Sequence, residues 1–189
     1  MAFFDPQPPG RTPDDETLGP EHGPWESWYS IPPAVISTQL VLAQTDDAAV
    51  VISDLHVYDT GFLIHLHAVT RLPMSRRRFR AMYDWAGEET VADEMLRFGV
   101  QFADGGIATN LDHDRQTSGV ELRPGGGTGG PTRIDDAYTV RPLPPAGPLR
   151  MVCQWPTFEI DETSHEIDGT LIRDAARNAR QLWPEGSAR

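Results

Sequence analysis

The chain has no lysine, one cysteine and no long apolar run, and each absence removes a class of function. All 16 basic residues are arginine, so no lysine can form a Schiff base, complete a P-loop or serve a kinase. The single cysteine, Cys153, excludes an internal disulfide bond. Because no basic leader and no run of about 18 apolar residues occurs, we expect a protein that is neither secreted nor membrane-spanning, with the cytoplasm as its compartment.

Positive charge is also scarce. The formal net charge is −12, with 16 basic against 28 acidic residues, and nucleic acid and anionic lipid carry the same sign. The sequence therefore predicts no nucleic-acid partner and no membrane partner. The local exception is RRRFR, with Arg76, Arg77, Arg78 and Arg80. We interpret it as a solvated excursion, and the functional alternative is a contact for an acidic partner or for the chain's own acidic tail.

Residues 1–33 differ in composition from the rest of the chain. Prolines and acidic residues dominate there, and Arg11 is the only basic residue. Such a segment buries too little apolar surface to offset its ordering entropy, so we predict a largely disordered acidic tail. Within it, Trp25, Trp28 and Tyr29 form an aromatic cluster that we expect to dock, either on the protein's own sheet or on a partner subunit.

Residues 34–189 are predicted to form one domain of short strands. Period-two alternation and turn residues between apolar runs indicate strands in AVISTQLVLA, AAVVISDLHVY, GFLIHLHAVTRL, LRFGVQFADGG, RIDDAYTVRPL, PLRMVCQWP and FEIDETSHEID, with IATNL and GVELRP as short edge strands. Asp168 is expected to cap a helix over GTLIRDAARNARQLW. The predicted fold class is mostly β: an immunoglobulin-like antiparallel β-sandwich with a C-terminal α-helix.

The stretch PLPPAGPLRMVCQWP combines prolines with the only cysteine. Its prolines fit a rigid entry into a strand, in which Leu149, Met151, Cys153 and Trp155 share the apolar face. We therefore expect Cys153 to be an inert core thiol. The segment GGGTGG lacks the lysine and the following helix of a phosphate-binding loop, so we predict a flexible hairpin loop there.

The histidines make the sharpest site hypothesis. If Leu55 and Val57 face the core, then Asp54, His56, His65 and His67 share the opposite face of two neighbouring strands. Such a set can hold zinc, with the carboxylate available to support the ligands. The simpler interpretation is a polar sheet face without a metal, since the glutamate of a cupin-type spacing is absent from HLHAVTRLP. We predict no resident cofactor, with zinc as the alternative.

Several motifs resemble those of a widespread set of uncharacterised actinobacterial proteins. They are LRFGVQFADGGIATNL, the turn and strand PLPPAGPLRMVCQWP, the corner YDTGF and the alanine-rich helix ending in LWP. The resemblance spans most of residues 36–184 and implies no particular activity. It implies that the proline-rich turn belongs to the shared scaffold. It also implies that other polar or small residues replace His65 and His67 in that set, so a zinc site would be specific to this chain.

Three hypotheses of function remain. The first is a non-catalytic protein that acts by binding or assembly, through an unknown protein partner or through self-association. The second is a metal-dependent enzyme built on the strand-borne histidines. The third is a structural or accessory subunit of a larger particle or defence system, tied together by the aromatic tail. No catalytic residue is assigned, because any acidic protein offers carboxylate pairs by chance.

Overall fold

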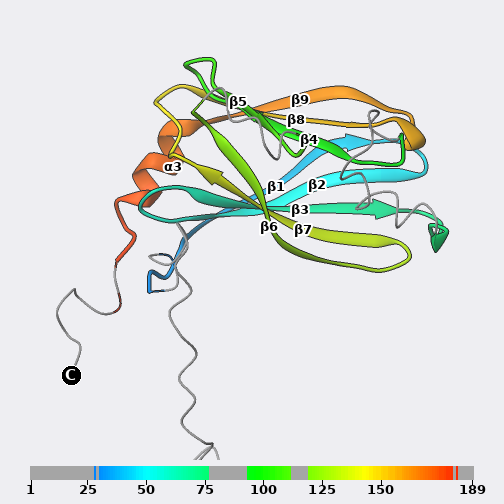
Figure 1. Ribbon diagram of the computed structural model, residues 1–189, viewed down its shortest axis with the longest axis horizontal. Coiled ribbons are helices and arrows are strands. Elements are labelled where there is room, and N and C mark those ends of the chain that lie inside the picture. The colour runs from blue at the N-terminus through cyan, green and yellow to red at the C-terminus, as the bar shows by residue number, and fades with distance from the viewer. Residues whose placement is uncertain (1–27, 29, 77–92, 112–118, 181, 183–189) are drawn as a thin grey trace, which may run out of the picture.

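Two antiparallel β-sheets pack face to face in the computed structural model, which describes residues 28, 30–76, 93–111, 119–180 and 182 (Figure 1). The larger sheet has the order β1-β2-β3-β7-β6, with β1 Ala34–Gln44, β2 Ala48–Val57, β3 Phe62–Thr70, β7 Arg133–Arg141 and β6 Glu121–Gly129. The smaller sheet has the order β5-β4-β8-β9, with β5 Ile107–Thr109, β4 Arg97–Gln101, β8 Pro148–Trp155 and β9 Ile160–Asp168. A 3-10 turn, η1 (Pro156–Phe158), links β8 to β9.

The predicted antiparallel β-sandwich with a C-terminal helix is confirmed, but the strand order differs from that of an immunoglobulin domain. In constant-type immunoglobulin domains the second and third strands lie in opposite sheets. Here β1, β2 and β3 follow one another in the same sheet as a meander. The larger sheet is completed by β7 and β6, which come from the second half of the chain.

The core lies between the two sheets and follows the alternation of the sequence. In β3, Phe62, Ile64 and Leu66 are fully buried. In β8, the predicted inward residues are also buried: Leu149, Met151, Cys153 and Trp155 are at most 1% exposed. The predicted inward residues Leu96, Phe98, Val100 and Phe102 are buried as well. Period-two patterning therefore placed the core side chains correctly.

A buried asparagine, which directly follows β5, forms side-chain hydrogen bonds with the backbone at the start of β4. Asn110 is 4% exposed. Its side-chain oxygen accepts a hydrogen bond from the backbone N–H of Phe98 at 2.9 Å, and its amide donates to the carbonyl of Leu96 at 2.9 Å. Since unpaired backbone groups are costly inside a core, this side chain replaces two missing sheet hydrogen bonds.

The glycine-rich segment is part of a strand, so the predicted hairpin loop is corrected. Strand β6 runs through Gly129, and its partner β7 begins at Arg133. Two of the glycines are closely packed: a Cβ on Gly125 would lie 3.0 Å from Leu63 Cδ2, and one on Gly127 would lie 2.2 Å from Asp136 Oδ1. Gly126 between them faces open space and has a positive φ of 106°.

The C-terminal helix α3 (Gly169–Ala176) lies at one end of the sandwich (Figure 1). The predicted cap is present, because Asp168 Oδ1 accepts a hydrogen bond from the backbone N–H of Thr170 at 2.8 Å. Ile172 is fully buried and anchors the helix to the core. The helix is shorter than the sequence pattern predicted, which extended it through the tryptophan of RQLW.

Trp28 packs against the chain's own sandwich. Its ring stacks on Tyr58 with centroids 4.2 Å apart and 4° between the planes, and Nε1 donates to Thr60 Oγ1 at 3.0 Å. The guanidinium of Arg141 lies 5.7 Å from the ring centroid. Trp28 is 7% exposed, so the residues before β1 include an anchored part of the domain.

Candidate functional site

The candidate site lies on the face of β2 and β3 that points away from the core. Asp54 and His65 are direct partners across the two strands, and His56 follows two residues after Asp54. Leu55 and Val57 are fully buried on the opposite face. The structure thus brings Asp54, His56 and His65 together on one face, as the alternation predicts.

A β-bulge in β2 shapes this face. Ile52 pairs with Leu66 and Asp54 pairs with His65, so Ser53 is an extra residue without a partner on β3. A bulge leaves its extra residue unpaired and bends the strand. The neighbouring strand β1 is irregular at the same level, with a register shift between Ser37 and Leu40 and a positive φ of 49° at Gln39. As a result, the side chains of Ser53 and Asp54 both reach the outer face.

The three predicted ligands are in direct contact. Nδ1 of His65 lies 2.5 Å from Oδ1 of Asp54, and Nε2 of His56 lies 3.1 Å from the same oxygen. The two imidazole rings meet edge to face with centroids 4.3 Å apart. One potential metal-ligand atom from each residue lies within 4.8 Å of the other two. Their side chains are between 24% and 30% exposed.

His67, the fourth predicted residue, faces the same way but is held apart from this group. Its Nδ1 contacts Oδ1 of Asp135 on β7, and its Nε2 lies 2.8 Å from Oγ of Ser53. Arg133 in turn donates from Nε to Oδ1 of Asp135 at 2.6 Å. His67 therefore belongs to a second pair that is joined to the first through Ser53.

Ser53 connects the two groups. Its hydroxyl donates to Oδ2 of Asp54 at 2.5 Å, while its oxygen is the atom that faces Nε2 of His67. The result is a continuous chain of polar contacts from Arg133 through Asp135, His67 and Ser53 to Asp54. This chain fixes the orientation of the Asp54 carboxylate.

The electrostatics favour an ionised Asp54 beside a neutral His56. Burial raises the pKa of Asp54, but hydrogen bonds from Ser53 and His65 and the nearby imidazole charges outweigh it, and the net pKa is lowered. Burial and then the charge of His65 lower the pKa of His56, despite the opposing effect of Asp54. Burial likewise raises the pKa of Asp135, and His67 and Arg133 reverse the effect to give a lowered pKa.

Ser53, Asp135 and Arg133 were missed by sequence reasoning. A signal for Ser53 was present: the buried residues of β2 are Ala48, Val50, Ile52, Leu55 and Val57, so the period of two is interrupted by one step of three. That step marks a bulge. Asp135 and Arg133 carry no such signal, because their position depends on the pairing of β3 with β7, some 66 to 68 residues further along the chain.

The other predicted contact residues are distributed as follows. Trp28 is buried against Tyr58 in the chain's own domain, and Arg76 is exposed. Trp25, Tyr29, Arg77, Arg78 and Arg80 lie outside the described residues. Cys153 is 1% exposed, and burial raises the pKa of its thiol to about 11.

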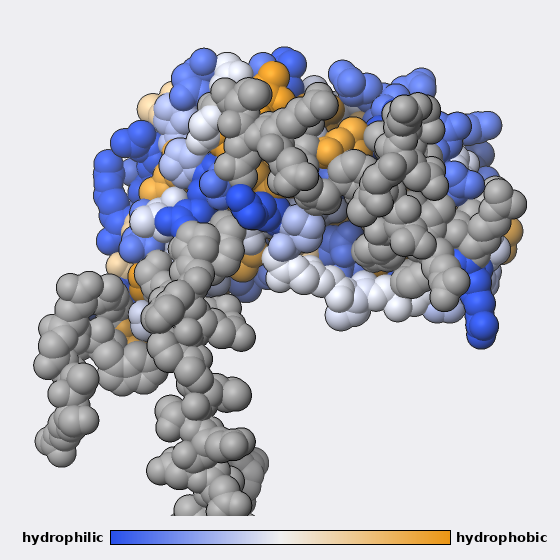
Figure 2. Space-filling view, viewed as in Figure 1, coloured by the Kyte–Doolittle hydropathy of each residue, from blue (hydrophilic) through white to orange (hydrophobic). Residues whose placement is uncertain are grey.

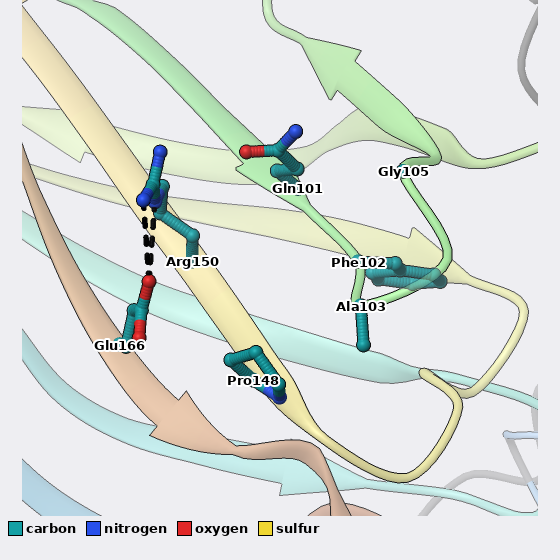
Figure 3. Close-up of a pocket in the computed structure, with 7 residues that line it drawn as sticks. All are labelled: Gln101, Phe102, Ala103, Gly105, Pro148, Arg150 and Glu166. Carbon is teal, nitrogen blue, oxygen red and sulfur yellow. Dashed lines mark hydrogen bonds and ion pairs between the residues drawn. The ribbon is translucent and has the colours of Figure 1, made fainter.

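Two open cavities lie away from the histidines. One of about 210 Å³ lies over the smaller sheet between Gln101, Pro148 and Arg150 (Figure 3). Among the described residues that line it, the charged pair Arg150 and Glu166 bond each other at 3.3 Å. The other, of about 260 Å³, surrounds the β1–β2 turn at Asp46 and Asp47. Neither cavity includes a residue of the histidine site.

Two exposed valines of β1 lie beside the polar site on the same outer face. Val35, which is 60% exposed, lies opposite His56. Val41, which is 45% exposed, lies opposite Val51, and Val51 lies opposite His67. On the side of the molecule seen in Figure 2, apolar surface occurs in small separate groups among polar surface. On the outer face of the larger sheet, the register places Val35 and Val41 beside the hydrogen-bonded polar side chains of Asp54, His56 and His67.

Comparisons with protein-family models, with curated proteins and with solved structures found no match to this chain. Within the described residues, no helix has the length and apolar character needed to cross a membrane.

Proposed function

We propose that this protein acts by binding another protein, without catalysis, through the outer face of its larger sheet. The observation that carries the proposal is the exposure of Val35 and Val41 beside Asp54, His56 and His67 on one sheet face. Protein interfaces combine apolar contacts with polar groups that fix orientation. Neither of the two cavities includes these side chains, and an open face suits a macromolecule better than a small substrate, which is usually enclosed in a concave site.

The charge of the chain indicates the chemistry of the partner. With a net charge of −12, the protein attracts a positively charged surface over distances of about 8–10 Å at moderate salt. The partner we propose is therefore a protein with basic residues around an apolar contact patch. Association should slow as salt concentration rises, because screening removes the long-range attraction.

The test compares two surface variants of the full chain, recovered from cells of its native host. In Val35→Glu/Val41→Glu, charge replaces the exposed valines of the outer face. In Ile107→Glu, charge replaces a side chain that is 51% exposed on β5 of the other sheet. We expect a partner that is recovered with the wild type and with Ile107→Glu, and at least about tenfold less with the double variant.

Two results would contradict the proposal. Equal recovery of the same proteins with both variants would show that the outer face makes no contact. A native mass spectrum with a dimer that Val35→Glu/Val41→Glu abolishes, and no other protein recovered, would replace the basic partner with a second copy of the chain.

A further inference from the structure

We propose that Asp54, His56 and His65 form a three-ligand site for a divalent transition metal, zinc in the first place, on the outer face of β2 and β3. This assignment goes beyond protein binding and depends on different side chains from the valines tested above. It also differs from a site built on all of the strand histidines, because His67 is given a supporting role.

The backbone brings these ligands together. Asp54 and His65 face each other across β2 and β3, and His56 lies on the same face one period further along β2. Both strands are interior members of the larger sheet, with β1 on one side and β7 on the other. Ligands on interior strands keep their relative positions better than ligands on loops, so the site is preorganised.

The interatomic distances suit a metal after small side-chain rotations. With zinc bonds of about 2.0–2.2 Å, tetrahedral geometry places ligand atoms about 3.3–3.5 Å apart. His56 Nε2 and Asp54 Oδ1 are already 3.1 Å apart. His65 Nδ1 is 2.5 Å from that oxygen, so this pair must open by nearly 1 Å. All three ligand atoms lie within 4.8 Å of one another.

The ligand types select the metal class. Two imidazole nitrogens and one carboxylate oxygen suit zinc and its neighbours among the divalent transition metals. Calcium and magnesium need more oxygen ligands than Asp54 supplies. Three protein ligands leave a fourth coordination position for water or for a group of another molecule.

The surrounding hydrogen bonds orient the carboxylate ligand, Asp54. Ser53 donates to Oδ2 of Asp54, which leaves Oδ1 directed at the two imidazoles. Ser53 is held by His67, and His67 is held by Asp135. Partners of this kind orient metal ligands, and their loss costs about 10- to 100-fold in metal affinity. His67 is thus a positioning residue for Asp54.

The experiment titrates ZnCl₂ into the full, untagged chain after treatment with a chelator. Isothermal calorimetry and metal analysis after dialysis should give one zinc per chain. His56→Ala and His65→Ala should each abolish this stoichiometric binding. Replacement of zinc by Co²⁺ should give visible d–d bands of tetrahedral intensity in the wild type, and these bands should disappear in the same two variants.

Two further variants make the result specific. His165→Ala removes a half-buried histidine of β9, in the other sheet, and should leave binding unchanged. His67→Ala should keep the stoichiometry and the cobalt bands but weaken affinity by about 10- to 100-fold. His65→Gln preserves much of the side-chain volume, so loss of binding with an unchanged circular dichroism spectrum excludes unfolding as the cause.

The assignment is overturned if the wild type binds no zinc at micromolar free metal. It is also overturned if one zinc per chain still binds to the His56→Ala variant and to the His65→Ala variant. Complete loss of binding and of the cobalt bands in His67→Ala would make His67 a ligand and would contradict the ligand set proposed here.

Discussion

Replacement of Trp28 by alanine tests whether the residues before β1 are part of the folded domain. The indole ring is 7% exposed, stacks on Tyr58 and donates a hydrogen bond to Thr60. Main-chain contact reinforces this position, because the backbone N–H of Leu182 donates to the carbonyl of Ser30 at 2.8 Å. Loss of the ring should therefore destabilise both the entry to β1 and the residues that follow α3.

The expected cost can be worked from these contacts. A buried tryptophan removes about 150–250 Å² from water, worth about 4–6 kcal/mol as an upper limit at 25 cal/mol per Å². The stacked pair and the indole hydrogen bond each add about 1 kcal/mol. Against this, release of two or three ordered residues regains about 1–2 kcal/mol each in backbone entropy. We expect Trp28→Ala to lower the free energy of unfolding by about 3 kcal/mol.

Urea unfolding followed by far-UV circular dichroism measures this difference, and a thermal scan should show a midpoint lower by about 6–12 °C. Trp28→Phe keeps the stacked ring but loses the bond to Thr60, so it should cost about 1 kcal/mol. The control Leu72→Ala, at a side chain that is 71% exposed, should stay within about 0.5 kcal/mol of the wild type. If Trp28→Ala were as stable as this control, the ring would not be docked in solution and the argument from its contacts would fail.

Experiments at three other places in the scaffold test Cys153, Asn110 and the glycines of β6. Cys153 should resist a thiol reagent in the native protein and react on unfolding, because it is 1% exposed with a pKa raised to about 11; rapid native labelling would contradict this. The thiol ionises near pH 9 in the unfolded chain and near pH 11 in the folded one. Burial of the neutral thiol therefore stabilises the fold fully below about pH 9, and this stabilisation is lost as the pH rises to about 11. Cys153→Ala should not show this loss. Asn110→Leu should cost about 3 kcal/mol by leaving Phe98 N–H and Leu96 C=O unpaired, and a cost below about 1 kcal/mol in urea unfolding would mean that other groups replace those bonds. Gly127→Ala should cost about 1–3 kcal/mol because its Cβ would lie 2.9 Å from the backbone oxygen of Asp135 as well as close to the Asp136 carboxylate, whereas Gly130→Ala, with its nearest contact at 3.9 Å, should be close to neutral in the same assay.

The strands were predictable because burial on one face imposes a period of two. In β8, Leu149, Met151, Cys153 and Trp155 are buried in alternation with more exposed residues. For β6 the sequence predicted the first part, GVELRP, as an edge strand, but it missed the continuation through Gly129, because the glycines carry no apolar pattern. The glycine-rich part of the strand pairs with β7, from Gly127 opposite Asp136 to Gly129 opposite Ile134. Contacts between strands that are distant in sequence decided the structure there, and local propensity did not.

The helix shows a different limit. Its start was predicted from Asp168, whose cap is a local interaction between neighbouring residues. Its end was not, because apolar spacing continued to Leu182 while the helix stops at Ala176. Beyond that point the backbone N–H of Leu182 bonds to Ser30, so a contact with the other end of the domain determines the path of the chain.

Strand alternation predicted which side chains of the site share a face, but it did not predict their contacts. Alternation placed Asp54, His56, His65 and His67 on one face, but it could not divide them into two groups. That division follows from the bulge at Ser53 and from the pairing of β3 with β7, which brings Asp135 to His67.

The bulge links the scaffold to the chemistry of the outer face. In a regular strand, only one outward-facing residue separates two consecutive inward-facing residues. Between the inward residues Ile52 and Leu55, the bulge allows two outward residues, Ser53 and Asp54. The extra residue, Ser53, bonds Asp54 on one side and faces His67 on the other. Bulges disrupt the hydrogen-bond ladder locally, and they are often found where they redirect a side chain next to a functional site. Strand β1 is also irregular at this level, near Gln39. Both strands therefore deviate from regular pairing beside the histidine site, and the deviation in β2 places Ser53 where it orients the carboxylate of Asp54.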